Sequence, residues 1–239
     1  MIEPQRQTGH APLRPDAGDA TAVAEMVADV LRERIVKGQL TPGDRIVERK
    51  LSDELNVSRT PIREALKLLR VDGLIEISRH RGAEVAGYTP AEALDLFDVI
   101  ASLESLAARR LAETITPDVL DHLEILHARM TEYHRTAALE PYFDTNSKIH
   151  ALVIASCGNP VLIASHSRLM LRAMRGRFMA IMDDNRWSQA VDEHDQLMAA
   201  LRARDVDRAA QVWGVHLRHT GATVSQMLEM QIAGASRID

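Results

Sequence analysis

The stretch LSDELNVSRTPIREALKLLRVDGLIEISRHRGAEV, residues 51–85, decides the fold of the first third of the chain. Near its middle, Ile62, Leu66 and Leu69 recur at the spacing of one helical face. This spacing predicts a helix over residues 59–72 that buries the apolar face. Its other faces would then be free for solvent or a partner.

Two further helices and a hairpin surround this helix. Residues 22–37 and residues 48–55 show helical spacing, and Asn56-Val57-Ser58 forms a break after the second of them, with Ser58 as the expected N-cap. Residues 74–77 and 83–85 alternate in polarity on either side of a basic, glycine-bearing tip, which predicts a β-hairpin. Three helices followed by such a hairpin predict a winged helix-turn-helix over residues 21–87.

The arginines of this region stand where a helix-turn-helix touches DNA. Because the N-terminal part of the second helix of the motif enters the major groove, Arg59 and Arg63 can address neighbouring bases or phosphates. Arg49 begins the preceding helix, which crosses the DNA backbone, and the wing tip carries Arg79 and Arg81. Any one of these arginines could merely solvate an amphipathic helix, but their order along the chain favours binding to double-stranded DNA.

Bulk charge gives this prediction little support. The chain carries 29 Lys and Arg against 34 Asp and Glu, a formal net charge of −5. Residues 21–87 contain 12 basic and 11 acidic residues, a net charge of +1, and residues 88–239 contain 15 and 20, a net charge of −5. The prediction of DNA binding therefore depends on where individual arginines stand.

Composition favours a helical protein. Apolar residues make up 46% of the chain and aromatic residues 3%, so the core must consist of Leu, Ile, Val, Ala and Met. No run of 18 apolar residues occurs, no stretch of signal-peptide type opens the chain, and the single cysteine, Cys157, cannot form an intramolecular disulfide. These features predict a cytoplasmic protein with no membrane partner.

From residue 88 onward the pattern predicts helices alone. Thr89-Pro90-Ala91-Glu92 combines a capping box with proline at the first helical position, and Thr116-Pro117 and Gly158-Asn159-Pro160 mark later boundaries. With Ser188 and Asp205 as further expected caps, about six helices follow. The predicted fold class is mainly α, with residues 1–20 as a disordered arm, 21–87 as the winged helix-turn-helix and 88–232 as an all-helical domain.

Four polar residues of the helical domain stand among apolar neighbours. Asn146 and His150 are one turn apart on one helical face, and His194 and His216 each lie within a later helix. Imidazoles that face the centre of a helical bundle can bind a metal ion, although a buried histidine is more often a hydrogen-bonded core residue. The other histidines, His166 among them, are interpreted as surface or loop residues, with His219 as a spare candidate.

The segment quoted above resembles the DNA-binding domain of the GntR family of bacterial regulators, and VSRTPIREAL, residues 57–66, is its most distinctive part. The resemblance runs without a gap from about Val23 to Val85. In that family, arginines, hydroxyl residues and a wing glycine contact DNA. The resemblance assigns this role to Arg49, Ser58, Arg59, Thr60, Arg63 and Gly82.

The remainder of the chain resembles the FCD domain, the all-helical effector domain of the FadR subfamily within GntR. The resemblance lies in LFDVIASLESLAARRLAE, NSKIHALVIASCGNP, DEHDQLMAAL and VHLRH. Many FCD domains bind a divalent metal, often zinc, through an Asp or Asn four residues before a histidine and two later histidines. The matching residues are Asn146, His150, His194 and His216. The resemblance therefore implies a bound zinc ion, with nickel or manganese as alternatives.

Two departures from the family pattern bear on the effector. Asn146 replaces the commoner Asp, so a bound ion would keep its full 2+ charge, which favours an anionic effector such as an organic acid. Ile100 stands where many relatives carry an arginine that points into the pocket. Arg172, Arg175 and Arg177 are the possible substitutes, and Arg172 and Arg175 are the predicted effector-binding residues.

The resemblance as a whole implies a transcriptional regulator, by default a repressor, that binds a small-molecule effector and sits on a short palindromic operator as a homodimer. Two alternatives stay open. Three histidines with an open coordination position would also suit a metal-dependent enzyme fused to a DNA anchor, although Glu193 is expected to point off the metal face. The helical domain could also be a dimerisation module whose histidines only form hydrogen bonds in its core.

Overall fold

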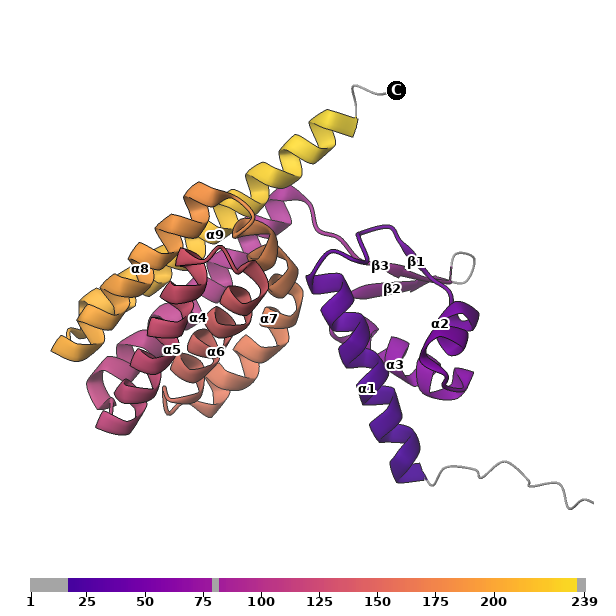
Figure 1. Ribbon diagram of the computed structural model, residues 1–239, viewed down its shortest axis with the longest axis horizontal. Coiled ribbons are helices and arrows are strands. Elements are labelled where there is room, and N and C mark those ends of the chain that lie inside the picture. The colour runs from indigo at the N-terminus through magenta and orange to yellow at the C-terminus, as the bar shows by residue number, and fades with distance from the viewer. Residues whose placement is uncertain (1–16, 79–81, 236–239) are drawn as a thin grey trace, which may run out of the picture.

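The computed structural model describes residues 17–78 and 82–235, which form a winged helix-turn-helix and a helical bundle side by side (Figure 1). The predicted fold class, mainly α, is confirmed. In chain order the elements of the described residues are α1 (Ala17–Val36), β1 (Arg45–Ile46), α2 (Glu48–Leu55), α3 (Arg59–Val71), β2 (Ile75–Ser78), β3 (Gly82–Val85), α4 (Pro90–Thr114), α5 (Pro117–Arg135), α6 (Leu139–Ala155), α7 (Pro160–Ala180), α8 (Asp184–Ala203) and α9 (Val206–Ala235).

The N-terminal domain has one small apolar core between its helices and its sheet. α1 packs against α3, and the predicted stripe of Ile62, Leu66 and Leu69 is buried. Helix, turn, helix and hairpin follow one another as predicted, so the winged helix-turn-helix is confirmed. Its core consists of Val27, Ala28, Leu31, Ile35, Ile46, Leu51, Ile62, Ala65, Leu66, Leu69, Leu74, Ile75, Ala83 and Val85.

The sheet contains one strand that the sequence pattern did not predict. β3 pairs antiparallel with both β1 and β2, with Arg45 opposite Glu84 and Ile75 opposite Val85. β1 has two residues, one exposed and one buried, so it is too short to show an alternating pattern. It ties the segment before α2 to the wing.

Several helix boundaries follow the predicted capping chemistry. The Thr89 hydroxyl accepts a hydrogen bond from the Glu92 N–H, and the Glu92 carboxylate accepts one from the Thr89 N–H, so the predicted capping box is present. Thr116 caps α5 as predicted, and Asn159 caps α7 at the predicted break in the chain. Asp205 accepts a hydrogen bond from the Arg208 N–H at the start of α9.

Two predicted boundaries are wrong. Ser188 does not begin a helix, because the Asp183 carboxylate already accepts a hydrogen bond from the Arg186 N–H and α8 begins at Asp184. α1 begins at Ala17, within the segment that was expected to be a disordered arm. Asp183 and Ser188 are both good capping residues, so composition alone does not choose between them.

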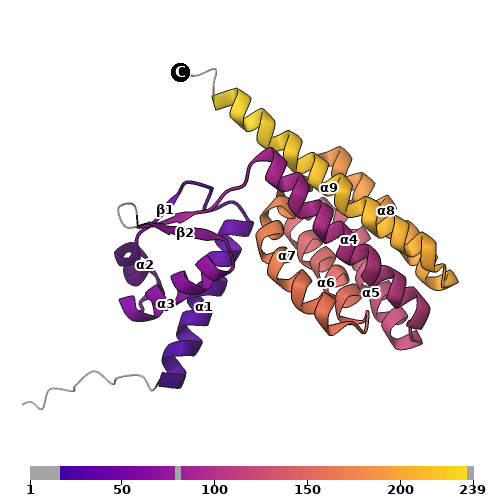
Figure 2. The ribbon, with the colours of Figure 1, turned by 180° about the vertical axis from the view of Figure 1, so that it is seen from behind.

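In the helical domain, α4 and α9 lie along each other, and the remaining helices pack against this pair and one another (Figure 2). The two helices approach closely where glycine faces the partner. A Cβ on Gly221 would lie 2.5 Å from the Cβ of Phe97, and one on Gly214 would lie 3.2 Å from that of Ser105. None of the helices in the described part of the chain is both long and apolar enough to cross a membrane.

Gly221→Ala is expected to destabilise the protein by about 1–3 kcal/mol, because the added methyl group would collide with Phe97 inside the α4–α9 contact. The change is measured as a shift in the urea unfolding midpoint. Gly234→Ala in the same helix is the matched control, since no described atom lies within 4 Å of a Cβ at that position. Equal midpoints for the two variants would show that the contact tolerates the extra volume.

The two domains touch through α1, α6 and α7. Lys37, directly after α1, donates hydrogen bonds to Glu33 at 2.8 Å and to Glu140 of α6 at 2.6 Å. Arg172 of α7 packs against the turn after α3, where a Cβ on Gly73 would lie 3.0 Å from its Cδ. The helical domain therefore contacts the segment that follows the predicted DNA-reading helix.

Candidate DNA-binding face and metal centre

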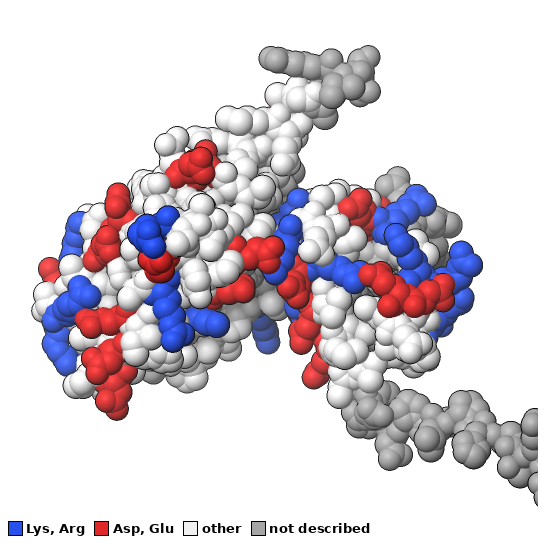
Figure 3. Space-filling view, in the orientation of Figure 1, with Lys and Arg blue, Asp and Glu red and all other residues white. Residues whose placement is uncertain are grey.

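The predicted DNA-binding residues of α2 and α3 are exposed and close together. Arg63 donates a hydrogen bond from Nε to the Glu48 carboxylate at 2.9 Å, which joins the first turns of α3 to the start of α2, where Arg49 stands. Ser58 is the N-cap residue of α3, but its hydroxyl makes no capping hydrogen bond. Lys and Arg side chains gather over this part of the domain, with acidic side chains beside them (Figure 3).

The wing is described on both sides of its tip. Gly82 opens β3 with a φ of 74°, a conformation that favours glycine. No atom of the described residues lies within 4 Å of a Cβ built there. Glycine is therefore favoured by the positive φ angle and not by steric crowding. The predicted DNA contacts of Arg79 and Arg81 lie outside the described residues.

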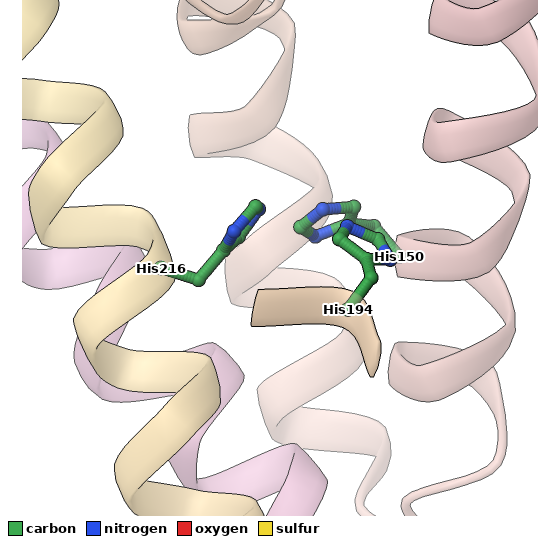
Figure 4. Close-up of side chains that lie close together, drawn as sticks. All are labelled: His150, His194 and His216. Atoms are coloured by element: carbon green, nitrogen blue, oxygen red, sulfur yellow. The ribbon is translucent and has the colours of Figure 1, made fainter. Parts of the chain in front are cut away.

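Three histidines from three helices converge inside the helical domain (Figure 4). His150 comes from α6, His194 from α8 and His216 from α9, and their potential ligand nitrogens lie within 4.8 Å of one another. The exposed fractions of these residues are 1%, 1% and 3%. The structure therefore brings the three predicted histidine ligands together in the interior of the bundle.

Three buried polar atoms at or near this cluster have no hydrogen-bond partner among the described residues. They are the Nε2 atoms of His150 and His194 and the Oδ1 atom of Asn146, which stands one turn before His150. Leaving a buried polar atom unpaired costs about 1–3 kcal/mol. Imidazole nitrogens that lie this close together fit a divalent cation, and an unpaired amide oxygen one helical turn away is a further potential ligand.

Glu104 of α4 forms a hydrogen bond with Nδ1 of His150. Its buried carboxylate accepts hydrogen bonds from His150 Nδ1 at 2.6 Å and from His166 Nε2 at 2.8 Å. Burial would raise the pKa of Glu104, but the contacts with the two histidines outweigh burial and hold that pKa well below its usual range. Because a carboxylate can only accept, the His150 proton lies on Nδ1 and the Nε2 lone pair faces the cluster.

Glu193 of α8 accepts a hydrogen bond from Nδ1 of His216, as Glu104 does from Nδ1 of His150. Its carboxylate accepts hydrogen bonds from His216 Nδ1 at 2.7 Å and from His219 Nδ1 at 2.6 Å, and it pairs with Arg186 at 3.0 Å. Burial opposes ionisation, yet these contacts lower the pKa of Glu193 to about 2. Glu193 contributes no atom to the histidine cluster itself, but its contact with His216 was not predicted.

The three imidazoles are uncharged at neutral pH. Burial lowers the pKa of His150 to about 3 and that of His216 to about 4, and it lowers the pKa of His194 well below its usual value. Neutral imidazole is the form that binds a metal ion. A cation that enters the cluster at neutral pH therefore displaces no proton from these rings.

Trp213 packs against all three rings, and the sequence analysis missed it. Its indole stacks on His150 and His216 at ring-centroid distances of 4.4 and 4.7 Å and meets His194 edge-on at 4.8 Å. Trp213 is fully buried and precedes His216 by less than one turn of α9. Its indole restricts the rotation of the rings and so helps to fix the shape of the cluster.

The interpretation of His166 as a surface or loop residue is wrong. His166 lies within α7, is 5% exposed and ends a chain of contacts that runs from His150 through Glu104. A buried imidazole needs a hydrogen-bond partner, and Glu104 supplies it. His219, the spare candidate, bonds to Glu193 and stays outside the cluster.

Many relatives carry an arginine at the position of Ile100. The three arginines considered as its substitutes lie in two different places. Ile100 is fully buried in an apolar cluster. Arg172 packs at Gly73, and Arg175 is close enough to Tyr88 and Asp44 for their charges to affect its pKa, which burial lowers. Arg172 and Arg175 are therefore at the domain junction, and of the three arginines it is Arg177 that lies beside His150.

A cavity of about 500 Å³ opens between α6 and α7 next to the cluster. Most of its wall is apolar, and His150, His166, Ser147 and Arg177 bring polar groups to it. A ligand in this cavity would reach both the edge of the histidine cluster and a buried guanidinium group. The apolar wall consists mainly of Ala151, Ile154, Ile163, Met170, Leu171 and Met174.

Two family models match the chain, one for each domain. The model described as "Bacterial regulatory proteins, gntR family" matches residues 23–85, and the FCD domain model matches residues 95–219. The first range covers the winged helix-turn-helix, and the second covers the histidine cluster with Glu104 and Glu193.

Curated relatives match over most of their length. The chain is 28% identical over 195 residues to the HTH-type transcriptional repressor GlaR of Escherichia coli K12. The aligned region covers 78% of this chain and 89% of the relative. The chain is also 29% identical over 198 residues to the gluconate operon transcriptional repressor of Bacillus subtilis 168, covering 80% and 79%.

Solved structures share the fold. E. coli McbR/YncC matches with a TM-score of 0.75 at 20% identity, over 86% of this chain and 98% of that one. A GntR transcriptional regulator from Rhodococcus sp. RHA1 matches with a TM-score of 0.70 at 23% identity, over 85% and 98%. At these identities the likeness supports the fold alone.

Proposed function

Because the chain belongs to the GntR family of bacterial regulatory proteins and carries an FCD domain, we propose that it is a repressor of transcription controlled by an organic acid bound at a metal centre. The domains and relatives identify a DNA-binding transcriptional regulator and not an enzyme, which sets aside the metal-dependent enzyme considered from the sequence. Two relatives described above are named transcriptional repressors, which supports repression here.

The DNA-binding part of the proposal assigns the operator contacts to the first turns of α3 and to its neighbours. Exposed guanidinium and hydroxyl groups at a helix N-terminus suit base edges and phosphates. Two copies of the chain, paired as a homodimer, would place two such helices on the half-sites of a short palindrome. The residues assigned to DNA are Arg49, Ser58, Arg59, Thr60, Arg63, Arg79, Arg81 and Gly82.

The metal part of the proposal assigns Asn146, His150, His194 and His216 to one divalent cation, with zinc favoured by the nitrogen ligands. One observation carries it: three buried imidazoles from three helices bring potential ligand nitrogens within 4.8 Å of one another, and the Nε2 atoms of His150 and His194 have no hydrogen-bond partner among the described residues. When bound, the ion would attract an anionic group of the effector. Glu104, Glu193 and Trp213 keep the ligand rings in place before the ion arrives.

The experiment uses the full chain, purified without chelator or added metal. Metal content is measured per chain, and the operator is selected from random DNA. We expect close to one zinc per chain, a palindromic site, and release of that DNA by an organic acid. A metal-free protein that still answers its effector would sink the proposed metal centre, and a metal-free protein that answers no acid would support a dimerisation module with hydrogen-bonded core histidines.

Glu104→Gln is expected to weaken zinc binding by about 10–100-fold, because an amide accepts the His150 proton less strongly and orients the ring less firmly. Zinc affinity is measured by competition with a chelator of known affinity. Glu113→Gln on the exposed side of the same helix is the matched control. Unchanged affinity in Glu104→Gln would show that Glu104 serves the fold alone.

A further inference from the structure

One side of α4 is exposed and carries an apolar line. Toward the bundle, the helix buries an apolar side that includes Phe97, Ile100 and Leu111. On the outer side, Val99 and Leu106 are 52% and 43% exposed. These two residues are seven apart in the sequence, so their side chains lie on one line along the helix. Apolar side chains grouped on a surface in this way indicate a contact with another molecule.

Charged residues stand at the two ends of this line. Asp95 and Asp98 precede Val99, Arg109 follows Leu106, and all three charged residues are exposed. Neither aspartate has an ion-pair partner among the described residues. Both lie beyond the first turn of α4, where the helix dipole no longer favours a carboxylate. The exposed side of α4 is therefore acidic at one end of the apolar line and basic at the other.

Two arginines supply the basic end. Arg109 donates a hydrogen bond from Nη2 to the Asp207 carboxylate at 2.7 Å, and its side chain is still 44% exposed. Because a guanidinium group has five donors, the remaining ones can meet a further carboxylate. Arg218 of α9 lies beside the same stretch of α4, since a Cβ on Gly214 would lie 3.5 Å from its Nη1 and 3.2 Å from the Cβ of Ser105.

The exposed side of α4 is complementary to itself about its midpoint, Ser102. Asp95 stands seven residues before Ser102, and Arg109 stands seven residues after it. In an antiparallel pair of α4 helices that cross at Ser102, the Asp95 of each copy therefore faces the Arg109 of the other. The apolar residues of the two copies then lie beside each other, and the small serine side chain lets the helices approach. Such a contact is isologous, because one patch meets the same patch of a second copy.

We propose that two copies of the chain pair through this side of α4, antiparallel and with the two-fold axis at Ser102. A second copy is the partner that the surface fits, because its acidic and basic ends match in sign and in distance from the centre. The inference rests on the proposed function, which calls for a homodimer, and adds the face and the register of pairing. Since α4 follows the wing directly, this pairing would determine where the two winged helix-turn-helix domains stand.

Disulfide cross-linking of the full chain tests the register. Ser102→Cys places a thiol on the two-fold axis, where it would meet the same thiol of the second copy within reach of a disulfide. We expect mild oxidation to convert most of this variant to a covalent dimer. Ser165→Cys, an exposed change on α7, is the matched control and should not be cross-linked. The native Cys157 is buried and should not react in either variant.

Charge reversal tests the contact between the two ends. Asp95→Arg and Arg109→Asp are each expected to weaken the homodimer about tenfold or more, because each reversal brings like charges together twice in a symmetric dimer. Sedimentation equilibrium measures the dissociation constant of the dimer. Asp121→Arg, an exposed reversal on α5, is the matched control and should leave that constant unchanged.

A mixture of the two charge-reversed chains tests whether the charges meet between copies. One chain has positive charge at both positions and the other has negative charge at both, so every facing pair in a heterodimer is again opposite in sign. We expect the mixture to form heterodimers with nearly wild-type affinity, while each chain alone pairs weakly. Mixing cannot repair the lost bond between Arg109 and Asp207 within one chain, so recovery reports contact between copies.

Three results would overturn the inference. They are a wild-type dimer that neither reversal weakens, a mixture that recovers no affinity, and absence of cross-linking in Ser102→Cys. In each case a wild-type dimer would leave the proposed homodimer in place and assign its contact to another face. A wild-type chain that stays monomeric even on operator DNA would instead contradict the homodimer of the proposed function. The thermal midpoint is measured for every variant, so loss of fold is seen directly.

Discussion

His194→Ala is expected to lower zinc affinity by more than about 100-fold, which exceeds the loss typical of changes behind the ligands. His194 turns an unpaired Nε2 toward the cluster, and its ring centroid lies 5.0 Å from that of His216 and 5.6 Å from that of His150. Alanine removes one of the three nitrogen ligands of the proposed centre. Zinc affinity is again measured by chelator competition.

The control for this prediction is His122→Ala, an exposed histidine on α5. It should keep one zinc per chain with unchanged affinity. Operator binding without effector should be the same in both variants, because the winged helix-turn-helix has its own apolar core. Stoichiometric zinc in His194→Ala would show that the proposed ligand set is wrong.

Arg63→Ala is expected to cost about 1–3 kcal/mol of specific operator binding, a loss of about 5- to 150-fold. The Arg63 side chain is 62% exposed at the N-terminal end of α3, and its Nε bond to Glu48 directs the guanidinium group from the adjacent helix. If Arg63 reads a base, the variant should also discriminate less strongly at one operator position. Fluorescence anisotropy at fixed salt measures both effects on labelled operator DNA.

Arg70→Ala is the matched control for Arg63→Ala. It removes the same charge from the exposed surface of the same helix, near the C-terminal end and away from the proposed groove. A loss caused by charge alone would be similar in the two variants and would shrink at high salt. Operator affinity that stays unchanged in Arg63→Ala would remove Arg63 from the proposed contacts.

Much of the fold could be predicted because it is encoded locally. The apolar stripe of α3 and the caps at Thr89, Thr116 and Asn159 act over a few residues, so they are readable in a single sequence. β1 could not be predicted in the same way, because two residues carry no period and the strand forms only when the distant β3 pairs with it. The N-cap of α8 at Asp183 was ambiguous because Ser188 is an equally good capping residue.

The histidines of the candidate site were predictable from their helical positions, but the groups that hold them were not. Glu104 contacts His150 and His166 across 46 and 62 residues of sequence, and no periodicity reports such contacts. One signal was available: Glu104 shares the spacing of Phe97, Ile100 and Leu111, the buried face of α4. A carboxylate on an otherwise apolar face requires a buried partner.

The stacking of Trp213 on two imidazoles gives the chain an internal optical reporter. The sequence contains two tryptophans, Trp187 and Trp213, and both belong to the helical domain. Tryptophan fluorescence of the intact protein therefore comes entirely from the helical bundle. The winged helix-turn-helix contains no tryptophan and contributes nothing to this signal. Because the emission of a stacked indole responds to charge on its neighbours, filling of the centre can be followed spectroscopically in unlabelled protein while the other domain remains on DNA.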